Sequence, residues 1–204
     1  MIQKQSFINL MIAGLLALSG AGAVKNEASA QERPRVQTER RAATPSGSVR
    51  ETTRLVREIR HELLTLPNYG VFDWLEGEVQ PDGIVVLRGQ VVRPTTKSDA
   101  AARVQEIEGV EKVIDQIQAL PLSPNDDRLR VALYRAIFND SSPLFRYALG
   151  ANPTIHIIVD NGRATLKGTV NSEMDKQLAY TQARSVAGVF DVKNELSVEK
   201  SDRQ

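Results

Sequence analysis

Residues 83–91 read GIVVLRGQV, and the same pattern returns 79 residues later as GRATLKGTV at residues 162–170. The shift superposes residues 83–119 on residues 162–198 without a gap, and nine of the 37 aligned positions are identical. Self-similarity over this length is typical of a duplicated supersecondary unit. The sequence therefore predicts two copies of one small fold.

Each copy is predicted to contain, in order, a helix, two strands, a second helix and a third strand. Apolar residues at helical spacing precede each repeated stretch, with an offset of 74 instead of 79. The matched pairs are Leu55 with Leu129, Ile59 with Leu133, and Leu63 with Ile137. Because strand–helix–strand crossovers are right-handed, both helices of a copy should cover one face of a three-stranded sheet. The predicted class is α+β, with two α-β-β-α-β units.

Capping signals predict where the helices begin. Ser123 precedes Pro124 and has Asp126 three residues later, which is the pattern of a helix N-terminus. The spacing of a capping box also starts at Ser48, Thr96 and Ser172. Four glycines are expected to serve the fold, two after helix ends and two within the hairpin strands. They are Gly109, Gly188, Gly89 and Gly168.

The first thirty residues are predicted to be a secretory signal peptide. Lys4 precedes an apolar run at residues 7–18, and Ala28-Ser29-Ala30 offers a small-x-small cleavage site. A cut after Ala23 and a retained N-terminal anchor remain alternatives. The predicted location is the periplasm, peripheral to a membrane.

Charge is unevenly distributed along the chain. Lys plus Arg number 26 against 25 for Asp plus Glu, which does not suggest a nucleic-acid partner. Residues 31–50 hold five arginines against two glutamates and are interpreted as a flexible linker, either a plain tether or a basic arm against anionic lipid. The predicted domains are then residues 51–122 and 123–200, followed by a short tail at 201–204.

The repeated motifs carry a family resemblance. Val-x-Leu-x-Gly-x-Val at 85–91 and Gly-Val-x-x-Val at 109–113 recur in the second copy, which ends in Asn194-Glu-Leu196. The pattern resembles the BON domain, in tandem. Asp115 in place of Asn and Ala164 in place of Val depart from it. The resemblance implies a non-enzymatic envelope protein linked to osmotic or membrane stress, with phospholipid binding and, for some members, chaperone-like behaviour.

The residues needed for catalysis are scarce. Cysteine is absent, which excludes disulfides and thiolate chemistry. The two histidines, His61 and His156, occupy non-equivalent positions and have no partner at a metal-ligand spacing, so each is interpreted as a surface or hydrogen-bonded residue. We expect no enzyme activity, no metal and no cofactor.

One segment suits a lipid headgroup region because aromatic and apolar residues flank an arginine there. It contains Leu144, Phe145, Arg146 and Tyr147, and Arg128, Tyr134 and Arg135 on the preceding helix extend the candidate surface. The alternatives are that the rings close over the core and that the arginines form a solvated helix face.

These features lead to a hypothesis of an envelope protein that binds anionic phospholipid. A soluble periplasmic chaperone or adaptor for unfolded envelope proteins is the alternative, and an oligomerising scaffold is a third. The oligomeric state and the packing of the two units stay open.

Overall fold

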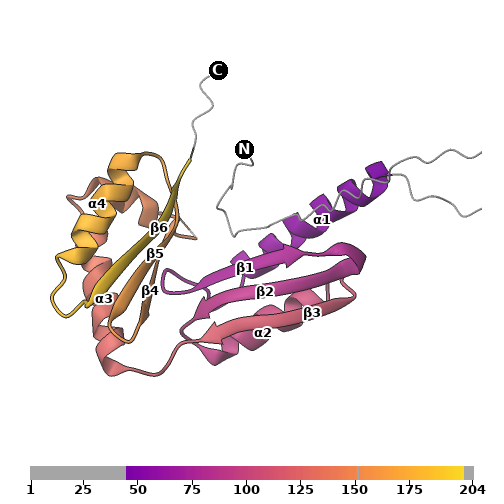
Figure 1. Ribbon diagram of the computed structural model, residues 1–204, viewed down its shortest axis with the longest axis horizontal. Coiled ribbons are helices and arrows are strands. Elements are labelled where there is room, and N and C mark those ends of the chain that lie inside the picture. Colours follow the sequence, from indigo (N-terminus) through magenta and orange to yellow (C-terminus); the bar gives the residue numbers. More distant parts are fainter. Residues whose placement is uncertain (1–44, 151, 200–204) are drawn as a thin grey trace, which may run out of the picture.

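The computed structural model describes residues 45–150 and 152–199, which form two units of the predicted order (Figure 1). Unit one contains α1 (Pro45–Leu64), β1 (Trp74–Val79), η1 (Pro81–Gly83), β2 (Ile84–Val91), α2 (Pro94–Gln105) and β3 (Lys112–Ala119). Unit two contains α3 (Pro124–Ile137), η2 (Pro143–Ala148), β4 (Ile155–Asp160), β5 (Arg163–Val170), α4 (Glu173–Arg184) and β6 (Asp191–Val198). The predicted signal peptide, most of the linker and the C-terminal tail lie outside the described residues.

Both sheets have the same topology. Their strand orders are β1-β2-β3 and β4-β5-β6, with the first pair antiparallel and the second pair parallel. In each unit the two helices cover one face of the sheet, as Figure 1 shows most clearly for α3 and α4. The predicted α+β architecture of two repeated units is confirmed.

The predicted helix faces form the two cores. Ile59 and Leu63 on α1 are fully buried with the inward strand residues of unit one, and Leu133 and Ile137 do the same in unit two. Each such side chain contributes about 1.5–3 kcal/mol when it leaves water. The helix offset of 74 is also confirmed, because an added Cβ on Gly109 or Gly188 would lie within 3.5 Å of the equivalent leucines, Leu55 and Leu129.

Gly89 and Gly168 are required by a close approach of neighbouring backbone. A Cβ on Gly89 would lie 1.9 Å from the carbonyl oxygen of Trp74, and one on Gly168 would lie 2.0 Å from that of Thr154. Neither oxygen can move without breaking the strand pairing. Both glycines therefore allow the close pairing of the two hairpin strands.

Two predicted helix starts are wrong. The first helix begins at Pro45, ahead of the Ser48 capping box, so residues 45–50 are helical. The second begins at Pro94 with Arg93 as N-cap, so Thr96 is buried inside the helix. In both cases proline, whose φ suits the first helical position, starts the helix earlier.

The other two caps are confirmed. The Ser123 hydroxyl accepts a hydrogen bond from the N–H of Asp126 (3.2 Å), and the Ser172 hydroxyl accepts one from the N–H of Asp175 (3.1 Å). These contacts satisfy N–H groups that a helix leaves without internal partners.

The hairpins differ by one residue, which changes the equivalence of the first strands. Residues 81–83 connect β1 to β2, whereas only Asn161 and Gly162 connect β4 to β5. Gly89 pairs with Leu75 in unit one, and Gly168 pairs with Ile155 in unit two. When these two pairs are aligned, the equivalent of Trp74 is Thr154 and that of Glu76 is His156.

Candidate functional site

The two units meet at the open face of the second sheet and along the free edge of β4. In Figure 1 this sheet turns its helices away from unit one and its uncovered face toward it. The N–H of Ile157 donates a hydrogen bond to the carbonyl oxygen of Val71 (2.8 Å) across the junction. Trp74 and Leu120 of unit one form a buried cluster with Ile158 of unit two. The junction therefore has an apolar centre and a main-chain link.

His156 occupies the middle of this junction. Its side chain is 4% exposed and its ring centroid lies 5.5 Å from that of Tyr69 and 5.1 Å from that of Trp74. Nδ1 lies 3.2 Å from the carbonyl oxygen of Gly70, so Nδ1 carries the proton and donates. Burial lowers the pKa of His156 to about 4, with backbone hydrogen bonds opposing this shift. The imidazole is neutral at neutral pH.

Ionic contacts surround the ring cluster. Lys167 of unit two lies 3.7 Å from Glu76 of unit one and 3.0 Å from Glu195. Its ammonium also lies 5.7 Å from the centroid of the Trp74 ring, whose indole N–H donates to Glu76 (2.5 Å). These contacts hold the indole in one orientation.

A buried carboxylate of unit one lies close to the same junction. Asp73 is buried and accepts hydrogen bonds from the N–H groups of Gly70 (3.1 Å) and Val92 (2.7 Å). Desolvation raises the pKa of Asp73, and the backbone hydrogen bonds, followed by the charges of Arg93 and of Arg130 in unit two, oppose that shift. Arg130 is itself buried and donates to the carbonyl oxygen of Val159 (2.8 Å).

The exposed face of α3 carries part of the predicted lipid surface. Arg128 and Arg135 are exposed there, and Val131 between them is 45% exposed. Their spacing of three and four residues places them on one side of the helix. Tyr134 lies at the edge of this face, where its ring contacts Phe72 of unit one (6.3 Å between centroids) and Phe138 (5.1 Å). Tyr134 therefore belongs partly to the junction.

The predicted segment at residues 144–147 is largely core. Leu144 is fully buried and Tyr147 is 5% exposed. The Tyr147 hydroxyl donates to Asp175 (2.9 Å) and accepts from the N–H of Asn171 (2.8 Å), while Arg146 donates to the same carboxylate (2.7 Å). Hydrogen bonds to the charged form and the Arg146 cation lower the pKa of Asp175, although its partial desolvation acts in the opposite direction.

This placement separates the members of the candidate surface. Leu144 and Tyr147 are core residues, so their prediction as headgroup contacts is corrected. Phe145 packs partly buried against the unit-two core, and Arg146 is half exposed but ion-paired. The alternative that aromatic rings close over the core describes this segment. Arg128 and Arg135 lie on the exposed face of α3, apart from the segment at residues 144–147.

Other exposed apolar residues had no periodic signal in the sequence. Leu122, Met174 and Phe190 are 93%, 80% and 80% exposed. The junction rings had only a weak signal, the concentration of Tyr69 and Trp74 between the first helix and the first strand. Nothing in the periodicity pairs those rings with a histidine more than 80 residues away.

Metal and membrane-spanning features are absent from the part of the chain that the structure describes. Residues 45–150 and 152–199 contain no group of three metal-ligating side chains. None of the helices within those ranges is both long and apolar enough to cross a bilayer.

Comparisons with known proteins follow the division into units. A family model described as the BON domain matches residues 71–121 and 125–200. A search of the curated proteins gives no match. Among solved structures, two chains of CdsD, described as a structural protein of the type III secretion system of Chlamydia trachomatis, are similar to this chain. They share 15% and 16% identity, with TM-scores of 0.27 and 0.26, over 72% and 71% of this chain and 94% and 97% of theirs.

Proposed function

Because the chain belongs to the BON domain family, we propose that it associates with envelope membranes by binding anionic phospholipid through the exposed face of α3. Membership of this family indicates an envelope-related protein, and BON domains are generally non-catalytic. Export by a signal peptide within residues 1–30 and residence in the periplasm are part of the same proposal.

The observation that carries the proposal is the arrangement Arg128–Val131–Arg135. Two exposed guanidiniums flank an exposed apolar side chain on one helix face. A guanidinium can donate two hydrogen bonds to a phosphate, and the valine can enter the boundary between headgroups and acyl chains. Each basic residue close to an anionic leaflet contributes about 1 kcal/mol to attachment.

The corresponding face of α1 in unit one lacks this arrangement, which supports placing the lipid contact on unit two. By the offset of 74, Arg54 occupies the place of Arg128, but it is held by Glu51 (2.7 Å) and Glu58 (2.8 Å). The position of Val131 is taken by Arg57, which is charged. The α1 face thus lacks the apolar centre, and its first arginine is already neutralised by carboxylates.

Flotation of the mature protein with phosphatidylglycerol vesicles tests the proposal. We expect co-flotation at low salt that weakens at moderate salt, because attraction between exposed charges is screened. Replacing both Arg128 and Arg135 with Gln should reduce the bound fraction at least about fivefold. The matched control, Arg57→Gln with Arg163→Gln, removes the same charge elsewhere and should float like the parent. Absence of co-flotation of the parent at either salt concentration overturns the proposal.

A second candidate function is an adaptor for unfolded envelope proteins. The exposed side chains of Leu122, Met174 and Phe190 favour it, since isolated large apolar groups on a surface can contact a client. Suppression of aggregation of an unfolded envelope protein without lipid tests it. Loss of that suppression in Phe190→Ser is expected if this candidate is right.

A further inference from the structure

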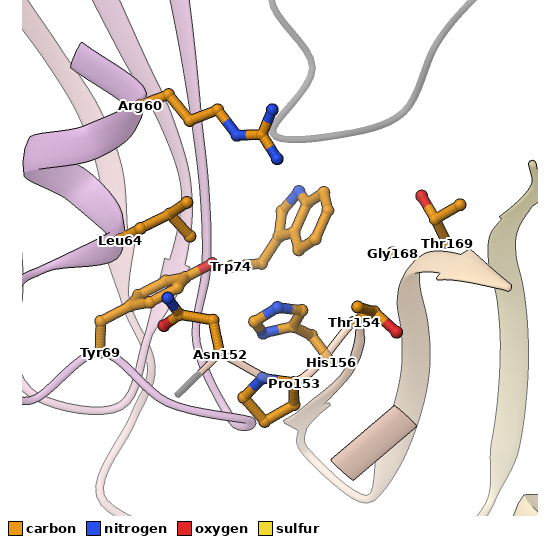
Figure 2. A pocket seen from close by; sticks show the side chains of 10 residues that line it. All are labelled: Arg60, Leu64, Tyr69, Trp74, Asn152, Pro153, Thr154, His156, Gly168 and Thr169. Atoms are coloured by element: carbon orange, nitrogen blue, oxygen red, sulfur yellow. The ribbon is translucent and has the colours of Figure 1, made fainter. Parts of the chain in front are cut away.

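A cavity of about 130 Å³, partly open to solvent, lies between the two units. None of its lining residues belongs to the buried residues of either core, although Leu64 and Tyr69 pack against the core of unit one. Its walls come from α1, β1 and the loop between them in unit one, and from β4, β5 and the segment that precedes β4 in unit two (Figure 2). The proposed membrane contact on α3 uses none of its lining residues. The cavity is therefore a separate feature that exists only while the units are docked.

Three rings form fixed walls of this cavity. Tyr69 and Trp74 come from unit one and His156 from unit two, and the Trp74 and His156 ring planes are 70° apart. The hydrogen bond from Trp74 to Glu76 and that from His156 to Gly70 hold two of the rings in place. Aromatic walls fixed in this way suit a flat ring, which can stack on one face and meet the edge of another.

The size of the cavity restricts the occupant. A cavity of roughly 150 Å³ in a protein interior accommodates one benzene molecule. The space here is similar, so it fits a single six-membered ring with one small substituent.

The charge of the walls favours an anionic substituent. Figure 2 shows the Arg60 side chain reaching from α1 toward the indole of Trp74. None of the described residues that line the cavity is acidic, and the nearby Glu76, which accepts from the Trp74 indole, is paired with Lys167. His156, the other basic side chain in the lining, is neutral at neutral pH. A carboxylate near Arg60 gains a charge-assisted hydrogen bond, whereas a cationic group would be repelled.

We propose that the junction of the two units binds a small aromatic carboxylate, with its ring among Tyr69, Trp74 and His156 and its carboxylate on Arg60. Such a ligand touches both units at once. Binding therefore favours the docked arrangement by mass action, because the site disappears when the units separate.

Trp74 provides the test because it is the single tryptophan of the chain. Titration of the full chain with benzoate at pH 7 should change its fluorescence saturably, with half-saturation below about 5 mM. Benzyl alcohol, which has the ring without the charge, should bind at least about tenfold more weakly. Absence of a saturable change with benzoate, or equal affinity for the two compounds, overturns the proposal.

Variants locate the carboxylate. Arg60→Gln should weaken benzoate binding about fivefold to tenfold and leave benzyl alcohol binding unchanged. Arg57→Gln, three residues earlier on the same helix, should leave both unchanged. Equal affinity of the parent and Arg60→Gln for benzoate contradicts the assignment of Arg60. Nuclear Overhauser contacts between benzoate protons and the indole protons of Trp74 should confirm the position of the ring, and contacts only elsewhere would contradict it.

Discussion

The imidazole of His156 lies 5.1 Å from the indole of Trp74, measured between ring centroids, and this contact joins the two units. One residue comes from the first strand of each sheet, so the pair reports on docking and not on the folding of either unit alone. Both side chains are at most 5% exposed. Chemical changes to either ring should therefore be measurable as changes in the stability of the tandem pair.

Acid should weaken the junction. The pKa of His156 is lowered by burial to about 4, below its ordinary value of 6.5, so folding favours the neutral ring. This contribution is fully present well above pH 6.5, is lost progressively as the pH falls from about 6.5 to about 4, and changes little below that. At pH 4.5 the loss is about 2–3 kcal/mol.

Urea unfolding at pH 7 and pH 4.5, followed by Trp74 fluorescence, checks this prediction. Asp73, whose pKa is raised by burial, acts in the opposite direction, but it is present in both the parent and His156→Gln. The difference in pH dependence between these two proteins therefore isolates the histidine. Equal pH dependence of parent and variant would contradict the prediction.

Adding a methyl group at Gly89 or Gly168 should severely destabilise the unit that contains it. The new Cβ would meet a backbone oxygen at 1.9 Å or 2.0 Å, and both glycines have positive φ. We expect each alanine variant to lose at least about 3 kcal/mol of unfolding free energy. Gly70→Ala is the control, because a Cβ there meets nothing within 4 Å. Thermal melts of the three variants measure this effect. A melting temperature of Gly89→Ala equal to that of Gly70→Ala would contradict the prediction.

Asp126 should stabilise unit two through the second hairpin. Its carboxylate is 1% exposed and accepts hydrogen bonds from the N–H groups of Asn161 (3.0 Å) and Gly162 (2.8 Å). Asp126→Ala leaves both donors without that acceptor, so we expect a loss of about 2–4 kcal/mol in denaturant unfolding. The neighbouring exposed Asn125→Ala should change stability by less than about 0.5 kcal/mol. A similar small change for Asp126→Ala would refute this role.

Thr96 and Ser172 should respond in opposite ways to removal of their hydroxyls. The Thr96 hydroxyl is buried without a hydrogen-bond partner, so Thr96→Val should be neutral or stabilising. The Ser172 hydroxyl caps α4 and also donates to Asp175 (2.6 Å), so Ser172→Ala should cost about 1 kcal/mol. Calorimetric melting of the two variants measures both effects, and a destabilised Thr96→Val would indicate a hidden partner.

The fold was predictable from the sequence because its signals are local or repeated. Helix periodicity, turn glycines and the 79-residue repeat each depend on residues close together or on comparison of the two copies. The start of α2 was not predictable from the capping pattern alone. Thr96 matches a capping box, but the helix begins two residues earlier, at Pro94. The alignment of the two copies argues against Thr96 as the N-cap, because Thr96 aligns with the buried Asp175 and not with Ser172, the N-cap of α4.

The departure at Asp115 is explained by its contacts. In unit two, Asn194 Oδ1 accepts from the N–H of Leu196 (3.2 Å) along the edge strand. In unit one, Asp115 Oδ1 accepts from the N–H of Ile117 (2.9 Å), and Lys97 lies 3.6 Å from the added charge. A carboxylate can replace the amide here because a cation compensates it.

The candidate site was predictable only in part. Arg128 and Arg135 were placed correctly on an exposed helix face by periodicity, which describes one helix at a time. The burial of Tyr147 depends on Asp175, 28 residues away, and the junction cavity depends on the docking of two units. Those contacts have no periodic signature in a single sequence.

The two copies have diverged at the positions that form their contact. Unit two has Thr154 at the position of Trp74, and unit one has Glu76 at the position of His156. Each copy therefore supplies only one of the two rings of the Trp74–His156 contact. A head-to-tail contact with both halves on every copy could add subunits without limit, as in a fibre. Here the contact is satisfied within one chain and leaves no matching half exposed. The divergence at these positions therefore makes the contact specific to the pairing of unit one with unit two.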